Sequence, residues 1–386
     1  MVRGLLLTLA LWTAGATVLR LTVAGALSCE APTVAELDEG IDAAARWLVA
    51  NQQADGRFLY EFDRRARTPL PTYNEVRHAG VTMSLYQLLL LRPGAYEWVR
   101  PAAERALERM LANLYHGEGW VAVSEPDGRT LKLGATALFV AALWHRREAT
   151  GDTSLDGTMV AAGRFLLALQ ERDGRMLAYW SVTDGAPVPD VTSRYYTGEA
   201  FWALALLARS FPEGPWRAAA ERTGAYLARE RDEREGLEFA PWPDQWAAYG
   251  FAALGAESLD EAARRYLTSL AERFGFLVRF DAQRDDAEWT RWLRGRPARA
   301  AGLGTWVEGL GNLGQLDHWD GDAAAAVRAR AACGAGLLLE RQVRAEPGDE
   351  PTYGAWFDRD LTRMDDQQHA LSALLLVRQL LTGDER

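Results

Sequence analysis

The feature that most constrains this chain is a repeat of paired helical segments. From Thr33 onward, apolar residues recur at helical spacing, and no stretch alternates with strand period over more than a few residues. First helices are predicted over residues 34–51, 100–114, 157–170, 215–229, 258–274 and 322–342. Second, more apolar helices should start near Glu75, Thr136, Glu199, Gln245, Thr305 and Gln367, at separations of 61, 63, 46, 60 and 62 residues.

A single hairpin of two helices cannot bury its own apolar face, so the repeats must stack on one another. Six stacked hairpins close into a ring, and the helices that are apolar on all sides belong to its inner layer. We therefore predict an all-α, single-domain ring over residues 33–383. Two capping boxes support the helix starts, one at Thr33–Glu36 and one at Ser258–Glu261.

The first 28 residues read as a targeting segment and not as part of the domain. Residues 4–19 are apolar behind Arg3, and a second apolar stretch follows Arg20. Ala24 and Ala26 fit a signal-peptide cleavage site, while the run ending in Cys29 resembles a lipoprotein box. The sequence predicts a signal peptide or a membrane anchor, and hence an exported protein, periplasmic or otherwise extracytoplasmic.

Net charge and cysteine content argue against a nucleic-acid-binding protein and against a cysteine-based zinc site. The chain carries 43 basic and 53 acidic residues, a net charge of −10, which argues against binding nucleic acid through bulk electrostatics. Its two cysteines, Cys29 and Cys333, cannot form a zinc site of paired cysteines. Cys333 is either a small buried apolar residue or, in an oxidising compartment, the disulfide partner of Cys29.

Two short motifs give the repeat a family resemblance. Gln52-Gln-Ala-Asp-Gly-Arg-Phe58 and Gln170-Glu-Arg-Asp-Gly-Arg-Met176 resemble the Gln-x-x-x-Gly-x-Trp repeats of squalene cyclases, with Phe58 and Met176 in place of tryptophan. Those repeats are structural marks of the (α/α)6 toroids, a superfamily of glycoside hydrolases, polysaccharide lyases, sugar epimerases, terpenoid cyclases and prenyltransferases. The chain lacks the second barrel and the Asp-x-Asp-Asp motif of triterpene cyclases, and its cysteines fit a prenyltransferase zinc site poorly.

The resemblance implies that residues at the starts of the inner helices converge on a central funnel. Carboxylates, tyrosines, tryptophans and arginines gather at these positions, as a carbohydrate site requires. The residues that we predict to bind substrate are Tyr73, Asn74, Arg77, Lys132, Arg194, Tyr195, Asp244, Gln245, Trp246, Trp306 and Gln367. Lys132 is the only lysine in the chain. A simpler role, helix capping, is open for Asn74, Asp244 and Asp365.

The first functional hypothesis is a glycoside hydrolase acting on an envelope or extracellular polysaccharide. Such an enzyme needs one protonated and one ionised carboxyl group. Glu75 and Asp366 are the favoured pair because hairpins one and six become neighbours on ring closure. Glu199 is the third candidate, and Asp244, Glu308 and Asp365 also lie near inner-helix starts.

The alternative hypothesis is a uronate C5-epimerase or a polysaccharide lyase. Here tyrosine or histidine moves the proton, and arginine or lysine neutralises the substrate carboxylate. Tyr196, His78 and His369 are the candidate catalytic groups, with the tyrosines, arginines and lysine named above as supporting residues. A further alternative is a toroid that binds a glycan or a partner without catalysis.

No cofactor is predicted, although one metal arrangement deserves a test. Glu75 and His78, and likewise Asp366 and His369, each place a carboxylate and an imidazole one helical turn apart. Pairs on adjacent hairpins could together hold a metal ion, whereas isolated pairs usually orient the imidazole.

The connection between residues 275 and 304 is unusually long. Its Trp289 and Trp292 either cover the substrate or pack a short helix against the ring.

Overall fold

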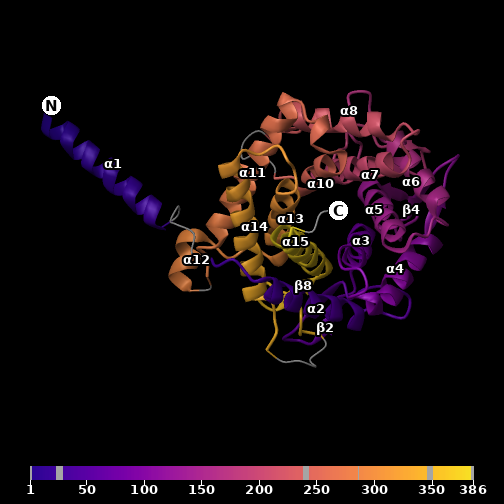
Figure 1. Cartoon of the computed structure of the whole chain (residues 1–386), viewed down its shortest axis with the longest axis horizontal. Helices are drawn as coiled ribbons and strands as arrows, with labels where there is room; N and C mark the ends of the chain where they lie inside the picture. The colour runs from indigo at the N-terminus through magenta and orange to yellow at the C-terminus, as the bar shows by residue number, and fades with distance from the viewer. Residues whose placement is uncertain (1, 23–28, 238–242, 286, 346–350, 384–386) are drawn as a thin grey trace.

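The computed structural model describes residues 2–22, 29–237, 243–285, 287–345 and 351–383. Two concentric layers of helices surround a central axis (Figure 1), and the predicted (α/α)6 toroid is confirmed. The outer helices are α2 (Val34–Ala50), α4 (Arg100–Ala112), α6 (Asp156–Ala168), α8 (Trp216–Arg229), α11 (Glu261–Asp281) and α14 (Gly321–Arg341). The inner helices are α3 (Glu75–Leu91), α5 (Leu133–Thr150), α7 (Tyr196–Ser210), α10 (Gln245–Leu254), α13 (Ala300–Leu313) and α15 (Met364–Thr382).

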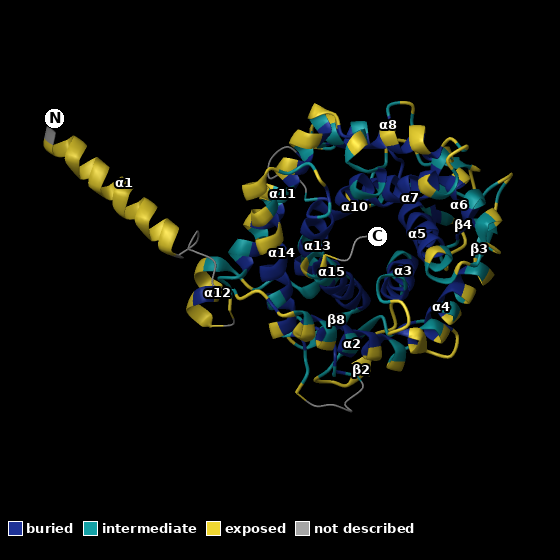
Figure 2. Ribbon diagram, in the orientation of Figure 1, coloured by how far each residue is buried: buried dark blue, intermediate teal, exposed yellow. Residues whose placement is uncertain are grey.

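Burial separates the two layers as the apolar pattern predicts. In α5 every residue from Leu133 to His145 is buried, whereas α4 buries a single face that includes Leu107 and Met110. Figure 2 shows the same contrast around the ring. Inner helices contact neighbours on both sides in the order α3, α5, α7, α10, α13, α15 and back to α3. Consequently α7 and α15 lie on opposite sides of the axis.

Short antiparallel strands precede several inner helices, which the sequence analysis did not foresee. They are β1 (Glu61–Asp63), β2 (Thr68–Pro69), β3 (Leu114–His116), β4 (Val121–Val123), β5 (Thr130–Lys132), β6 (Tyr179–Ser181), β7 (Ala186–Pro187) and β8 (Leu361–Arg363). They form three small sheets, β2-β1-β8, β3-β4 and β5-β6-β7. Strands of two or three residues are too short to show alternation in sequence. Short helices α9 (Arg231–Arg234) and α12 (Glu288–Arg294), with 3-10 turns at Glu97–Val99 and Ala256–Ser258, complete the ring.

The first hairpin (α2 and α3) meets the sixth (α14 and α15) at a seam that several contacts close. Strand β1 pairs with β8, placing Phe62 opposite Thr362. Ser84 on α3 and Ser372 on α15 share a buried hydrogen bond of 2.8 Å between their hydroxyls. The ring is therefore closed by backbone and side-chain hydrogen bonds as well as by apolar packing.

The two glycine motifs join consecutive outer helices in the same way. The Gln52 amide donates to the Ala102 carbonyl of α4 at 2.8 Å, and the Gln170 amide donates to the Ala219 carbonyl of α8 at 2.8 Å. Gly56 and Gly174 turn the chain with φ of 84° and 95°, which other residues rarely adopt. The motifs are structural, as their resemblance to squalene-cyclase repeats implies.

One of the two predicted capping boxes is confirmed. Thr33 caps α2, with the Glu36 N–H donating to its hydroxyl and its own N–H donating to the Glu36 carboxylate. The second is wrong, because Asp260 and not Ser258 caps α11, its carboxylate accepting from the Ala263 N–H at 2.9 Å. Ser258 ends a 3-10 turn and its hydroxyl donates to backbone carbonyls instead.

The N-terminal segment forms a separate helix, α1 (Val2–Thr22), which extends away from the ring (Figure 1). Residues 3–21 have a mean hydropathy of 1.5 and none of them is buried, so this helix is long and apolar enough to cross a membrane. A signal sequence passes the same test. The predicted cleavage site at Ala24 and Ala26 lies outside the described residues.

A disulfide joins Cys29 to Cys333 on α14, with their Cα atoms 5.3 Å apart. It leaves no thiol at Cys29 for a lipid, which argues against the lipoprotein alternative. The bond ties the start of the toroid to its last outer helix over 304 residues of sequence.

We expect Cys333→Ala to lower the free energy of unfolding by about 2–4 kcal/mol, because a cross-link restricts the unfolded chain. Thermal and urea unfolding of the non-reduced protein measure the loss. Cys29→Ala should cause the same loss, and the double variant should add nothing to either. Full additivity of the two single losses would contradict the disulfide.

Candidate active site

A cavity of about 910 Å³ opens where the inner helices begin, at the predicted mouth of the ring. All six inner helices or the loops before them contribute to its wall. Ten of the seventeen predicted site residues line it: Asn74, Arg77, Arg194, Tyr195, Tyr196, Glu199, Gln245, Trp246, Trp306 and His369. Seven do not: Tyr73, Glu75, His78, Lys132, Asp244, Asp366 and Gln367.

Three of those seven, Tyr73, Glu75 and His78, make hydrogen bonds at the start of α3 that do not involve the cavity. The Tyr73 hydroxyl lies 2.7 Å from His78 Nδ1, and His78 Nε2 lies 3.0 Å from the Ala106 carbonyl oxygen. Burial lowers the pKa of His78 to about 4, so the ring is neutral, donating from Nε2 and accepting at Nδ1. Arg109 of α4 donates to Glu75 Oε1 at 2.9 Å. Glu75, Tyr73 and His78 therefore hold α3 against the outer layer, and the catalytic roles predicted for Glu75 and His78 are not supported.

Asp366, the other carboxylate favoured by the sequence analysis, is also fully engaged in structural hydrogen bonds and an ion pair. Only 1% of its surface is exposed, and it accepts hydrogen bonds from the Ala301 and Arg363 N–H groups at 3.0 Å each. Arg299 adds an ion pair to the same carboxylate. Through these contacts Asp366 joins the start of α13 to the start of α15. The catalytic role predicted for the Glu75–Asp366 pair is therefore not supported.

The remaining three residues also have partners away from the cavity. Asp244 caps α10 and pairs with the buried Arg231, which confirms its capping alternative. Asn74 likewise caps α3 while lining the cavity. The Lys132 ammonium lies 2.9 Å from Glu125 Oε2, and the Gln367 amide donates to Thr362 Oγ1 at 2.6 Å. The substrate-binding roles predicted for Asp244, Lys132 and Gln367 are therefore not supported.

Glu199 is the protonated carboxyl group of the cavity. It is 4% exposed, and its Oε2 atom is buried without a hydrogen-bond partner among the described residues. Burial, with a smaller contribution from the nearby Asp244 carboxylate, raises the pKa of Glu199 to about 8. Gly134 on α5 makes room for it, since a Cβ atom at that position would collide with Glu199 Oε2 and the Tyr196 ring. Glu199 is therefore an acid at neutral pH.

Across the axis, α15 presents an imidazole that a buried carboxylate holds in place. His369 Nδ1 lies 2.7 Å from Glu308 Oε2, and the Tyr249 hydroxyl donates to Glu308 Oε1 at 3.2 Å. Burial opposes the charge on His369, but the Glu308 carboxylate outweighs it and raises the pKa of His369 above its usual value of 6.5. The Nδ1–H bond to Glu308 leaves Nε2 as the group that can exchange a proton with a ligand.

A second carboxylate, Asp365, lies at the start of α15 in the cavity wall. Its Oδ2 atom lies 3.3 Å from the Arg77 guanidinium and 3.0 Å from the Arg363 guanidinium. The capping alternative is thus wrong for Asp365. The neighbouring positions 365 and 366 face different surroundings, one the cavity and the other the α13 backbone.

Arginine dominates the charge of the wall. Five arginines line the cavity: Arg77, Arg194, Arg273, Arg299 and Arg363. They face two carboxyl groups, those of Glu199 and Asp365. Arg273 comes from the outer helix α11, has no ion pair among the described residues, and was missed by the sequence analysis. The cavity is therefore suited to an anionic ligand.

Aromatic and amide groups complete the wall. Trp246 stacks on Trp202 with ring centroids 5.5 Å apart, which fixes its face beside His369 at 5.8 Å. Tyr195 is 45% exposed at the rim. The Gln245 Nε2 atom is buried without a partner in the described part of the chain. Flat rings and free amide donors of this kind bind sugar rings and hydroxyls.

The proposed metal arrangement is absent from the described residues. Both His78 nitrogens are occupied, Asp366 is paired with Arg299, and His369 is bound to Glu308. Among the residues described, no group of three or more His, Cys, Asp or Glu side chains could hold a metal ion. The two carboxylate–histidine pairs serve structural or orienting roles instead.

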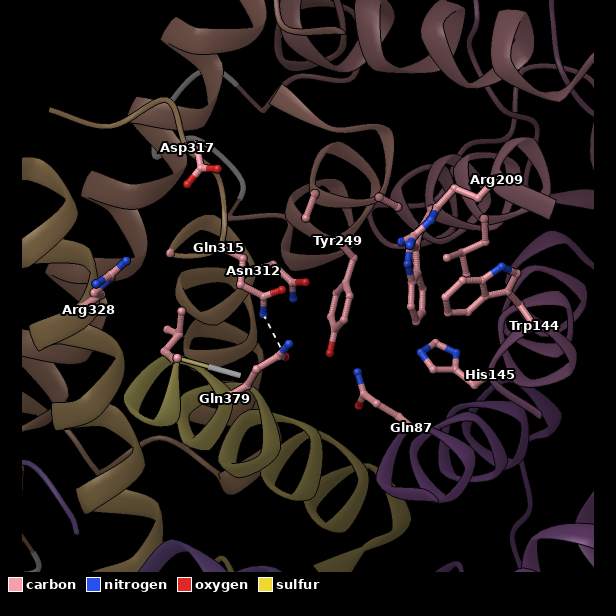
Figure 3. Close-up of a pocket in the computed structure, with 17 residues that line it drawn as sticks. Gln87, Trp144, His145, Arg209, Tyr249, Asn312, Gln315, Asp317, Arg328 and Gln379 are labelled. Atoms are coloured by element: carbon pink, nitrogen blue, oxygen red, sulfur yellow. Dashed lines mark hydrogen bonds between the residues drawn. The ribbon is translucent and has the colours of Figure 1, made fainter. Parts of the chain in front are cut away.

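A second cavity, of about 470 Å³, lies at the opposite end of the ring (Figure 3). Gln87, His145 and Tyr249 point toward one another there. Tyr249 reaches from this cavity to the Glu308 carboxylate that holds His369. It therefore separates the two cavities while supporting the first.

Solved structures share this fold at low sequence identity. Cellobiose 2-epimerase from Spirochaeta thermophila matches with 16% identity and a TM-score of 0.65, over 91% of this chain and 97% of that chain. An unsaturated glucuronyl hydrolase specific for heparin matches with 10% identity and a TM-score of 0.63, over 91% and 99%. A sugar epimerase from a ruminal bacterium matches with 11% identity and a TM-score of 0.61, over 92% and 100%. No protein-family model and no curated protein matches the sequence.

We expect Glu199→Gln to stabilise the protein at neutral pH. The carboxyl titrates near 4.5 in the unfolded chain and near 8 in the folded one, so its contribution to stability is full below pH 4.5 and is lost as pH rises to 8. Glutamine avoids that loss, and the gain over wild type should reach about 3 kcal/mol at pH 7.

Urea unfolding at pH 5, 7 and 8 tests this expectation. Asp366→Asn is the matched control, because its carboxylate is ion-paired and its removal should destabilise the protein at every pH. A Glu199→Gln variant whose stability difference from wild type does not change with pH would contradict the protonated state.

Proposed function

We propose that the protein is an extracytoplasmic carbohydrate-processing enzyme that transfers a proton at C5 of a uronate in an acidic saccharide. The observation that carries the proposal is the placement of two proton-transfer groups on opposing helices. Glu199 on α7 holds a proton at neutral pH, and His369 on α15 is oriented by Glu308. The two groups face one cavity with an excess of arginine.

The chemistry follows from the acidity of a carbon next to a carboxylate. His369 Nε2 takes the C5 proton, and the electron pair of the broken C–H bond spreads into the substrate carboxylate. Arginine neutralises the charge that develops there, and Arg273, which lines the cavity without an ion pair among the described residues, is the candidate for this role. Glu199 then donates its proton to C5 from the opposite face, which inverts the carbon. The reverse reaction uses the Glu199 carboxylate as base and the His369 imidazolium as acid.

Three further observations support an enzyme over a binding scaffold. A buried carboxyl group without a partner costs stability, and such groups concentrate at catalytic sites. Tyr196, whose pKa burial raises further above 10, stays protonated beside Glu199 as a hydrogen-bond donor. The structural neighbours include sugar epimerases and a glucuronyl hydrolase, which supports carbohydrate chemistry.

The location outside the cytoplasm is part of the proposal. It rests on the apolar helix α1 and on the disulfide between Cys29 and Cys333, because disulfides persist in oxidising compartments. A polysaccharide or oligosaccharide of the cell envelope is then the accessible substrate.

We expect uronate polysaccharides incubated with the protein in D₂O to acquire deuterium at C5. The rate should rise with pH as His369 loses its proton, with a midpoint above 6.5, and fall again near pH 8 as Glu199 ionises. His369→Gln and Glu199→Gln should each reduce exchange by about 100-fold or more.

Mass spectrometry and NMR of the recovered sugar measure the exchange. Glu75→Gln is the matched control, because the buried Glu75 carboxylate pairs with Arg109 and does not line the cavity. This replacement should leave the exchange unchanged. An unsaturated product with ultraviolet absorbance would assign β-elimination to the same groups. Unaltered exchange in the His369 variant would refute the proton-transfer proposal.

Hydrolysis is the second candidate, favoured by one specific observation. Glu199 is protonated and Asp365 is ion-paired with Arg77 and Arg363, so the cavity contains an acid and a second carboxyl group that can serve as base or nucleophile. This pair replaces the predicted Glu75 and Asp366.

If the protein is a hydrolase, Asp365→Asn should abolish the release of new reducing ends, by about 1000-fold or more, while His369→Gln should retain it. Reducing-end assays on neutral and uronic polysaccharides distinguish the two candidates. Deuterium at C5 without new reducing ends would exclude hydrolysis as the main reaction.

A further inference from the structure

Helix α12 exposes the largest apolar side chains of the toroid. Trp292 is 87% exposed, Trp289 61% and Leu293 39%, whereas Thr290 on the opposite side of the helix is fully buried. Neither tryptophan lines the cavity. Their exposure contradicts the prediction that they pack α12 against the toroid, and the prediction that they cover the substrate is not supported. Two such rings side by side in water are unusual for a protein surface without a partner.

The helix is held firmly in this position. Arg284 donates to the Arg294 carbonyl at 2.8 Å, and the Arg294 guanidinium lies over the Trp289 ring at 5.7 Å. Asp281, at the end of α11, pairs with Arg341 of α14 at 2.7 Å. Asp281 also accepts from the Ala298 N–H at 2.7 Å, so the chain is tied to the end of α11 at the last residue of α12 and four residues beyond it.

The same flank receives the chain from α1. Six residues lie between Thr22, the last residue of α1, and Cys29, and the seven steps from one Cα atom to the next span at most about 25 Å. Cys29 is bonded to Cys333, and Cys333 precedes Arg341 on α14 by about 12 Å of helix. In the view of Figure 1, α12 lies on the side of the toroid from which α1 extends. A membrane crossed by α1 would therefore lie close to α12.

The residue types of α12 match a bilayer surface. Tryptophan concentrates at the membrane–water interface, where its ring is buried and its N–H remains hydrated. Residues 285–296 carry three acidic residues, Asp285, Asp286 and Glu288, and three arginines, Arg291, Arg294 and Arg296, so the segment has no net charge. The arginines lie beside and after the tryptophans, where they can meet lipid phosphates.

We propose that α12 docks on the outer surface of the bilayer that α1 spans, with Trp289, Trp292 and Leu293 inserted among the lipid headgroups. The proposal rests on α1 remaining attached as an anchor, as an exported protein allows. The chain runs from α12 directly to Arg299 and Ala301 in the cavity wall. Docking therefore places one edge of the mouth at the membrane, where the substrate would be a glycan held close to the lipid surface.

The full chain in vesicles tests the docking. An environment-sensitive fluorophore is attached at Glu288→Cys, on α12 but outside the three apolar side chains. Gly157→Cys is the matched control, since it is exposed on α6 across the ring and a side chain there meets nothing within 4 Å. Lipids that carry a quencher near the headgroup should quench the label at 288 about five-fold more than the label at 157.

Replacing Trp289, Trp292 and Leu293 with serine in the Glu288→Cys chain should remove the difference. These side chains lie outside the cavity, so turnover of a soluble substrate should be unchanged, which keeps the test independent of the proposed reaction. Equal quenching at 288 and 157 would overturn the proposal. So would a label at 288 that is shielded from water without being quenched by lipid, since that outcome indicates a protein partner or a second copy of the chain.

Discussion

The molecule depends on the contact between its first and last hairpins, because a ring of helical hairpins has no enclosed interior until its ends meet. The β1–β8 pairing and the Ser84–Ser372 hydrogen bond hold this seam. The seam also builds part of the site, since Arg77 comes from α3 and its partner Asp365 from α15. Closure of the ring therefore also forms this ion pair of the cavity wall. An open ring would separate Arg77 from Asp365 and expose the mouth to water.

The sequence predicted the ring well and its details less well. Glu75 and Gln245 begin their helices as expected, while Leu133, Tyr196, Ala300 and Met364 begin theirs three to five residues earlier than predicted. The first turn of these inner helices carries polar residues for the mouth, so the apolar pattern starts about one turn late. Strand pairs at the mouth left no signal, because two or three residues cannot establish a period.

The sequence predicted where the site lies, at the starts of the inner helices, but not which side chains there face the cavity. Each residue of a helix points about 100° from the previous one, and the start of a helix does not say which residue faces the axis. Glu75 turns outward to Arg109 while Arg77 faces the cavity, and Asp366 turns to α13 while Asp365 faces the cavity. Arg273 had no local signal at all, because an outer helix supplies it. Glu308 was expected near the start of its helix but lies more than two turns into α13, buried beneath the cavity wall, and its role emerged only from its hydrogen bond to His369.

The disulfide imposes an order of events on maturation. Cys29 is made early in synthesis, whereas Cys333 follows only after five hairpins and more than half of the sixth outer helix. The thiol of Cys29 must therefore stay free until most of the chain has been made. The disulfide can form only after the outer helix of the last hairpin has been made. It is therefore a late step that cross-links the two ends of the ring once they have come together.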